Sequence, residues 1–195
     1  MENKIDELIA QLNKTKGFSR KNAERFIFDL IGNKAKIKDF KDIINYIDNN
    51  FAECEICFYL SENNVCPICS DNSRNKNKIL VVSSIPDAHT IERSNLYNGL
   101  YHVLKGEINI NKNQTPDKLT LENLLQRIDK EKEVILALNS TFEGEVTANF
   151  VAQLVKNQTD KVSRIAKGMP VGGMLDYIDN LTLKSAINNR EKYED

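Results

Sequence analysis

The segment Cys54-Glu-Ile-Cys57 is followed by eight residues and then by Cys66-Pro-Ile-Cys69. These two Cys-x-x-Cys pairs hold all 4 cysteines of the 195-residue chain. Four thiolates at this spacing can converge on one tetrahedral ion, and Zn²⁺ favours soft sulfur ligands in that geometry. The segment therefore predicts one structural zinc ion per chain, bound by Cys54, Cys57, Cys66 and Cys69.

Three other interpretations fit the same four cysteines: two disulfides, an iron–sulfur cluster, or two redox-active pairs. Disulfides require an oxidising compartment, which nothing in the sequence indicates. A redox pair normally lies at a strand-to-helix turn, and one pair would be enough for that chemistry. Because a four-thiolate zinc shell leaves no open coordination position, the zinc interpretation implies a structural role.

Composition indicates an ordinary globular protein, with 41% hydrophobic and 28% charged residues. A chain of this length forms one domain of good size or two small ones. No apolar segment follows the N-terminal Met-Glu-Asn-Lys, and no apolar run approaches the length of a membrane span. We therefore expect a cytoplasmic protein without a membrane partner.

Three helices are expected before the cysteines. Gly17 suits a tight turn between the first two helices, and Ser19 can cap the second. Helical spacing predicts these inward residues: Ile5, Leu8, Ile9 and Leu12 in the first helix, Ala23, Phe26, Ile27, Leu30 and Ile31 in the second, and Phe40, Ile43, Ile44 and Ile47 in the third. Gly32 and Asn33 are expected to end the second helix.

Positive charge is concentrated in this helical part. Residues 14–41 contain nine Lys or Arg residues and three acidic ones, although the formal net charge of the chain is −1. Lys21 and Arg25 are four residues apart and share the face opposite the apolar stripe. This face is either a DNA-backbone contact or an ordinary solvated cationic surface.

An alternation of strands and helices follows the cysteines. Short apolar runs predict buried strands at 79–82, 101–104, 134–138 and 162–166, with helices between them. This order predicts a parallel sheet covered on both faces. Residues 72–77 are a candidate hinge, and Thr182 can cap a final helix that ends near Asn189. The glycine-rich loop 168–173 lacks a Walker A ending, so ATP hydrolysis is not expected.

The order of these parts, together with four strings, resembles the RecR family of bacterial recombination mediators over essentially the full length. The strings are Lys16-Gly-Phe-Ser-Arg-Lys-Asn-Ala-Glu-Arg25, Gly99-Leu-Tyr-His-Val-Leu104, Asn139-Ser-Thr-Phe-Glu-Gly-Glu-Val-Thr-Ala148, and Arg164-Ile-Ala-Lys-Gly-Met-Pro-Val-Gly-Gly173. The chain departs from the family pattern at Ser19, at Ser83 and Ser84, and in the loop 108–117.

This resemblance implies a multi-part α+β fold. Its expected parts are a helix-hairpin-helix DNA-binding region at 1–52, a four-cysteine zinc finger at 53–72, an α/β Toprim domain with a parallel sheet at 78–167, and a C-terminal loop and helix for oligomerisation at 168–195. The implied DNA-binding residues are Lys21 and Arg25, with Lys16 and Arg20 adding to the same field.

The resemblance also implies a function. The expected protein is a non-catalytic mediator of recombinational DNA repair that acts with RecO and RecF to help load RecA on gapped DNA. It is expected to bind single- and double-stranded DNA without sequence preference, to form a homo-oligomeric ring of four chains, and to associate with the nucleoid.

Catalysis is not expected, because Toprim enzymes combine a glutamate after the first strand with an acidic pair after the third. This chain keeps Glu143 and Glu145 but has Ser83 and Ser84 at the other corner. The two glutamates are either a weak Mg²⁺ or partner site, or helix N-terminal charges. The alternatives are a Mg²⁺-dependent Toprim nuclease or topoisomerase-like enzyme, with a displaced acid such as Asp87 or Glu92, and a zinc-stabilised scaffold that binds only protein.

Overall fold

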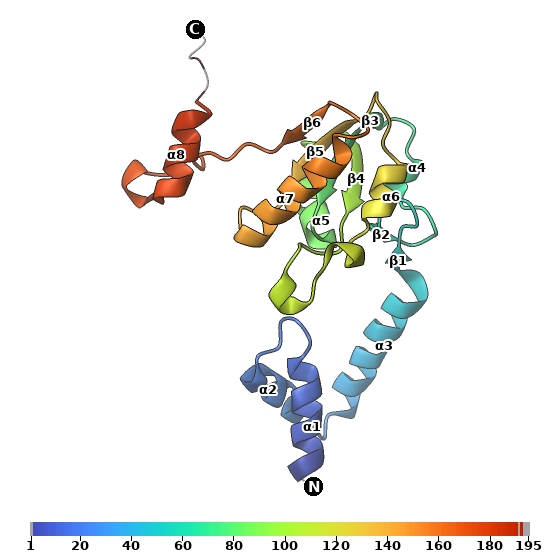
Figure 1. Ribbon diagram of the computed structural model, residues 1–195. Coiled ribbons are helices and arrows are strands. Elements are labelled where there is room, and N and C mark those ends of the chain that lie inside the picture. Colours follow the sequence, from blue (N-terminus) through green and yellow to red (C-terminus); the bar gives the residue numbers. More distant parts are fainter. Residues whose placement is uncertain (1, 191, 193–195) are drawn as a thin grey trace. The chain divides into compact units, whose positions relative to one another are not determined.

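The computed structural model describes residues 2–190 and 192, and it divides after Phe51 into two compact units. Unit 1 comprises three helices (Figure 1): α1 (Glu2–Asn13), α2 (Arg20–Leu30) and α3 (Lys34–Asn50). Gly17 takes a φ of +97° in the turn between α1 and α2, a conformation that favours glycine. Ser19 caps α2 as expected, because its hydroxyl accepts a hydrogen bond from the Asn22 amide at 3.3 Å.

Much of the apolar face predicted for unit 1 is exposed. Among its described residues, Ile9 and Ala23 are buried hydrophobics. The expectation that α3 points inward is wrong: Phe40, Ile43, Ile44 and Ile47 are 41–55% exposed, and Ile31 after α2 is 57% exposed. Helical spacing identified an apolar face correctly, but the described part of unit 1 does not cover it.

Unit 2 contains a small antiparallel hairpin and a four-stranded parallel sheet. The hairpin pairs β1 (Ala52–Glu53) with β2 (Leu60–Ser61), and the short helix α4 (Pro67–Ser70) follows it. The large sheet has the order β4-β3-β5-β6, with strands β3 (Asn75–Val82), β4 (Gly99–Val103), β5 (Glu133–Ala137) and β6 (Val162–Arg164). The prediction of a parallel sheet is therefore confirmed.

Helices and short turns connect these strands along the chain (Figure 1). They include α5 (Ile85–Arg93), the 3₁₀ turns η1 (Ile110–Lys112) and η2 (Pro116–Lys118), α6 (Leu121–Gln126) and α7 (Phe142–Val155), and the chain continues through η3 (Leu175–Tyr177) to α8 (Asn180–Asn188). The final helix is capped by Asp179, whose carboxylate accepts bonds from two backbone amides, and not by Thr182 as expected.

Each face of the sheet has its own core, because successive side chains of a strand point to opposite faces. The helix-side core contains Ile79 and Val81 of β3 together with residues of α6 and α7. The zinc-side core contains Leu80 and Val82 of β3, Ala88 of α5, and residues of the cysteine segment. The cysteine segment is thus part of a core that it shares with the sheet.

The segment 72–77 is not the hinge that we expected. Strand β3 already begins at Asn75, which pairs with Gly99 of β4. The guanidinium of Arg74 forms an ion pair with the carboxylate of Glu92 on α5, and the Arg74 side chain is only 15% exposed. These contacts fix the segment to the sheet.

None of the described helices combines the length and the apolar character that a bilayer span requires.

Candidate functional site

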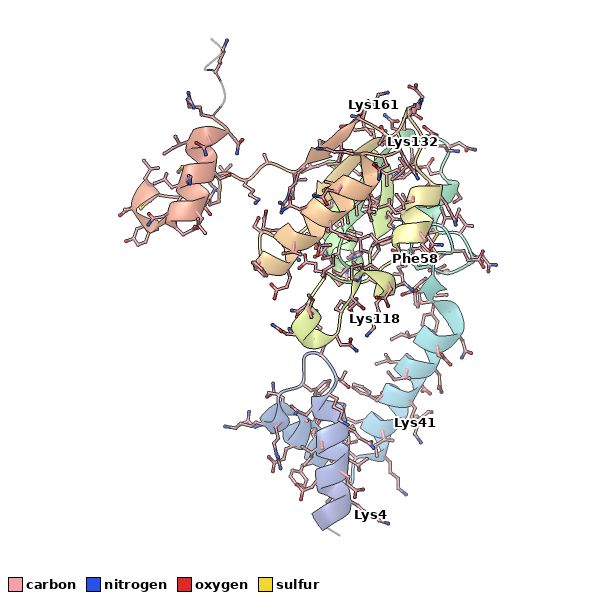
Figure 2. The ribbon with its side chains drawn as sticks, viewed as in Figure 1. Lys4, Lys41, Phe58, Lys118, Lys132 and Lys161 are labelled. Atoms are coloured by element: carbon pink, nitrogen blue, oxygen red, sulfur yellow. The ribbon has the colours of Figure 1, made fainter. Side chains whose placement is uncertain are left out.

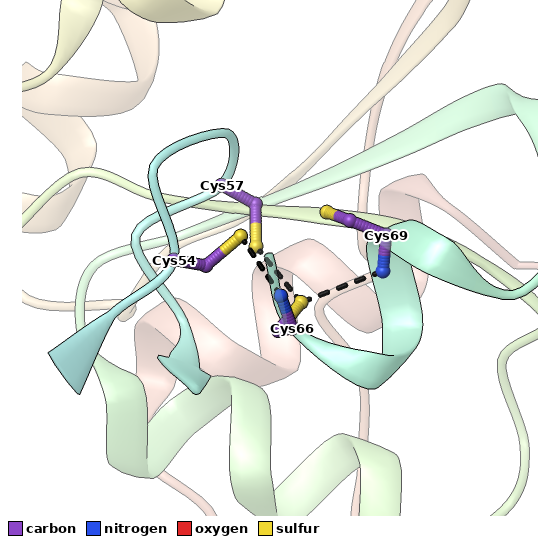
Figure 3. Close-up of side chains that lie close together, drawn as sticks. All are labelled: Cys54, Cys57, Cys66 and Cys69. Atoms are coloured by element: carbon purple, nitrogen blue, oxygen red, sulfur yellow. Dashed lines mark hydrogen bonds between the residues drawn. The ribbon is translucent and has the colours of Figure 1, made fainter. Parts of the chain in front are cut away.

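The four cysteines converge at one point (Figure 3). Their sulfur atoms all lie within 4.8 Å of one another, and three of the residues, Cys54, Cys57 and Cys66, are completely buried. Cys69 is partly exposed. In the part of the chain that the structure describes, no other group of three or more His, Cys, Asp or Glu residues converges in this way.

Backbone amides support the sulfur atoms (Figure 3). The Cys66 amide donates to Cys54 Sγ at 3.3 Å, and the Cys69 amide donates to Cys66 Sγ at 3.4 Å. Cys66 is also the N-cap of α4, where Pro67 suits the first turn because its missing N–H would have no helical partner. The local chain geometry therefore aims both pairs of sulfur atoms at a common centre.

The chemistry of this centre matches zinc. The sulfur atoms of Cys57 and Cys66 are 3.5 Å apart, much farther than the S–S bond of about 2.05 Å in a disulfide. Hydrogen bonding to Cys66 and to Cys69, and then burial and the charge of Cys69, raise the pKa of the Cys57 thiol. A divalent ion would favour the thiolate form of its ligands, and four sulfur donors in a closed shell are the usual ligands of structural zinc.

The cysteine segment, residues 54–69, is called the zinc-binding segment from here on. It packs directly on β4. The Val103 amide donates to the Cys57 carbonyl at 2.9 Å, and the ring of Tyr59 stacks on that of Tyr101 with 6.4 Å between centroids. Phe58, which Figure 2 labels, belongs to the same segment. Its ring lies edge-on to that of His102, at 5.6 Å between centroids. The free edge of β4 is therefore covered by the zinc-binding segment.

His102 is a core residue of β4. It is completely buried, and its Nε2 lies 2.9 Å from both the carbonyl and the hydroxyl oxygen of Thr120. The guanidinium of Arg127 lies 3.0 Å from Nδ1. Burial, and then the charge of Arg127, lower the pKa of His102 to about 3, so the ring is neutral and donates through Nε2.

The carboxyl ends of the strands form a second polar cluster, which we call the polar edge. At this edge Glu145, in the first turn of α7, accepts two hydrogen bonds from the Arg164 guanidinium at 2.6 and 2.8 Å. Lys167 donates to the same carboxylate. The pairing with Arg164, assisted by Lys167, lowers the pKa of Glu145 to about 2. The negative charge of Glu145 is thus paired with two cations of the same chain.

The other acids near this edge are also engaged. Both Ser83 and Ser84 donate to Asp87 Oδ2 at 2.6 Å. Glu143 accepts a hydrogen bond from the Asn109 side chain at 3.0 Å, and Glu92 pairs with Arg74. The displaced acids that the enzyme alternative required therefore do not meet Glu143 and Glu145 in a common site.

Sequence reasoning missed Glu107 and Asn139 at the polar edge. The Glu107 carboxylate accepts bonds from the Asn139 backbone amide at 3.2 Å and side-chain amide at 2.9 Å, and from the Thr141 hydroxyl at 3.3 Å. This network fixes the loop after β4 to the end of β5. Glu107 could have been suspected from its position just after a strand, and Asn139 from its place in a family string, but no local pattern connects residues 32 positions apart.

The cations predicted to contact DNA all lie on the surface of unit 1. Lys16, Lys21 and Arg25 are exposed and pair with no other described residue, while Arg20 lies 3.9 Å from the exposed carboxylate of Asp6. Lys21 and Arg25 are on consecutive turns of α2. Their side chains are therefore available to a ligand.

Replacing Glu145 by Gln is expected to remove a pH-dependent part of the stability. The folded pKa of this carboxyl lies below its ordinary value, so its ion pairs stabilise the fold above about pH 4.5 and are lost as the pH falls towards 2. Because the side chain is 34% exposed, we expect a cost of only about 1 kcal/mol at neutral pH. Urea unfolding at a series of pH values measures both effects.

Glu143→Gln is the matched control, because it removes an equal charge one position before Gly144 but leaves the pairs with Arg164 and Lys167 intact. The control should retain the steeper loss of stability below pH 4.5. If both variants followed the same pH profile, the ion pairs of Glu145 would not stabilise the folded state.

Comparison with known proteins agrees with this architecture. The chain matches the four-cysteine zinc finger domain of RecR over residues 52–71, the Toprim domain over 77–166, and the RecR C-terminal domain over 168–191. It is 38% identical over 195 residues to the recombination protein RecR of Rickettsia bellii, with 98% of each chain covered. It is 39% identical to that of Rickettsia felis (99% and 98% covered) and 37% identical to that of Phytoplasma mali (97% and 95% covered).

These relatives are named as recombination proteins and not as enzymes. The zinc finger match falls on the four converging cysteines, which supports one structural zinc ion per chain. The Toprim match covers the parallel sheet and α7. Identity at this level over nearly the whole length shows that the chain belongs to the RecR family of recombination proteins.

Proposed function

We propose that the protein is a non-catalytic, DNA-binding mediator of recombinational repair that acts with RecO and RecF to help load RecA on gapped DNA. The observation that carries this proposal is the full-length similarity to RecR together with the exposed cations of the α1–α2 hairpin. The roles of RecO, RecF and RecA in this proposal are taken from the resemblance to the RecR family. The protein would work in the cytoplasm, in association with the nucleoid.

The DNA contact in this proposal consists of Lys21 and Arg25 on α2, with Lys16 and Arg20 beside them. All four side chains are exposed, and such cations contact phosphates and carry no sequence information. The hydroxyl of Ser19 already accepts the Asn22 amide at the start of α2. The binding energy is therefore expected to come from the cations more than from the turn amides, for single- and double-stranded DNA alike.

The resemblance to the RecR family implies a homo-oligomeric ring of four chains. Contacts between chains in such a ring would cover the apolar surfaces that a single chain leaves exposed. In unit 1 a groove of about 800 Å³ is lined mainly by apolar side chains of all three helices. In the C-terminal segment, Val171, Tyr177 and Leu181 are at least 80% exposed. Apolar surface of this extent on a small chain marks an interaction site. A ring would also repeat the few cations of each chain around the DNA.

The absence of catalysis in this proposal follows from the polar edge. Toprim chemistry requires free carboxylates that hold Mg²⁺. Glu145 is paired with Arg164 and Lys167, and Asp87 with two serines. We expect Glu143 and Glu145 to bind Mg²⁺ weakly at most, and their remaining role to be structural or in partner contact.

The test combines DNA binding, mass and cleavage on one gapped duplex. We expect the logarithm of the binding constant to fall linearly with the logarithm of salt concentration, because phosphate contacts release counterions. Light scattering should give a mass of four chains, and RecO and RecF should increase the rate at which RecA covers the gap. DNA that is cut in Mg²⁺ or Mn²⁺ would instead establish a Toprim enzyme, and failure to bind DNA at low salt would favour a protein-binding scaffold.

A further inference from the structure

All thiol chemistry of this protein is confined to the zinc-binding segment, since the chain has 4 cysteines and all four lie there. Burial is unequal among them. Cys54, Cys57 and Cys66 are 0% exposed, whereas Cys69, at the end of the second pair, is partly exposed. Cys69 is therefore the cysteine residue of this set that a small oxidant reaches most readily.

The neighbouring sulfur atoms favour disulfide formation after such an attack. All four lie within 4.8 Å of one another, and Cys57 Sγ is 3.5 Å from Cys66 Sγ. Bringing two of these atoms to bonding distance requires a shift of about 1.5–3 Å in a segment of short loops. Once one thiolate is oxidised, another is always near enough to react with it.

The two cores of unit 2 depend unequally on the zinc-binding segment. The zinc-side core contains Cys54, Cys57, Cys66, Tyr59 and Ile68 themselves. The helix-side core contains no residue before Ile79. The Cys57 carbonyl also accepts the Val103 amide at the free edge of β4. Disturbing the zinc-binding segment therefore affects β4 and the zinc-side core, while α7 keeps its packing in the helix-side core.

We propose that the zinc-binding segment is an oxidation-sensitive cap on β4, which peroxides open by converting the four thiolates into two disulfides. The Cys69 thiolate takes one oxygen from the peroxide, the O–O bond breaks, and hydroxide leaves. A neighbouring thiolate then attacks the sulfenic sulfur, the S–O bond breaks, and a second hydroxide leaves. Each pair of thiolates gives two electrons to one peroxide as its disulfide forms, so two peroxides oxidise all four thiolates and the site loses its ligands.

The experiment treats the zinc-loaded full-length protein with hydrogen peroxide and follows three quantities. A chromogenic chelator measures released zinc, a thiol assay with mass spectrometry counts disulfides, and hydrogen exchange reports on the peptides. We expect zinc to be released in step with the loss of four thiols. Exchange should increase in residues 54–69 and 99–104 and stay unchanged in 148–155. Reduction with dithiothreitol and added zinc should reverse these changes.

Cys69→His is the matched variant, because histidine keeps four zinc ligands while removing the partly exposed thiolate. It should release zinc several-fold more slowly than the wild type at the same peroxide concentration. Three results would each overturn the proposal: thiols that stay reduced in millimolar peroxide, zinc release without disulfides, or unchanged exchange in 99–104 after oxidation. Equal release rates for the variant and the wild type would contradict the assignment of Cys69 as the site of attack.

Discussion

The substitution Cys57→Ser should yield a protein that does not retain zinc and whose zinc-side core unfolds, so that the protein aggregates. A structural zinc site contributes about 10–16 kcal/mol of folding free energy in zinc-finger peptides, whereas a whole domain is stable by about 5–15 kcal/mol. Cys57 is completely buried, and its carbonyl accepts the Val103 amide, so its loss reaches the edge of the sheet directly. Elemental analysis should give one zinc per chain for the wild type and near zero for the variant.

Ser70→Ala is the appropriate control. Ser70 adjoins the last zinc ligand, and its hydroxyl donates to the Cys66 carbonyl at 3.2 Å, but it offers the ion no thiolate. This variant should keep its zinc and lose only about 1 kcal/mol of stability. A folded, zinc-free Cys57→Ser protein with wild-type hydrogen exchange in β4 would show that the metal does not support the zinc-side core.

The double substitution Lys21→Ala/Arg25→Ala should weaken DNA binding at least tenfold at moderate salt. Each charged hydrogen bond to a phosphate contributes about 1.5–3 kcal/mol, and both side chains are exposed on the same face of α2. The slope of log binding constant against log salt should also decrease by about 1 for each phosphate contact that is lost. Fluorescence anisotropy with single-stranded and duplex DNA across a salt series measures both quantities.

Lys130→Ala/Lys156→Ala removes the same formal charge from two exposed positions of unit 2 and should bind DNA almost as the wild type does. Circular dichroism should show that both double variants are folded, because none of the four side chains is buried. Equal affinities for all three proteins would place the DNA contact outside α2.

The zinc site could be predicted from the sequence because its chemistry is local. Four ligands within sixteen residues define both the donor atoms and their approximate geometry, and the structure brings the four sulfur atoms together. The parallel sheet was predictable for a similar reason. Apolar runs of strand length alternate with helical patterns, and the order of elements along the chain leaves few arrangements of a buried sheet.

The packing of α3 could not be predicted, since periodicity shows which residues share a face but not what covers it. Ile43 and Ile47 have the spacing of core residues and are nevertheless at least half exposed. The contacts within the polar edge could not be predicted for a different reason. Glu107 meets Asn139, and Glu145 meets Arg164, only after the sheet has formed, and no local pattern connects residues that far apart.

The polar edge also bears on how readily such a protein could acquire a phosphodiester-cleaving activity. A new acid at Ser83 or Ser84 would supply the missing carboxylate, yet Glu145 would remain neutralised by Arg164 and Lys167. Removing those cations first would leave Glu145 unpaired and weaken the end of the sheet. Several substitutions would therefore be required together before this edge of the sheet could hold a metal ion for cleavage.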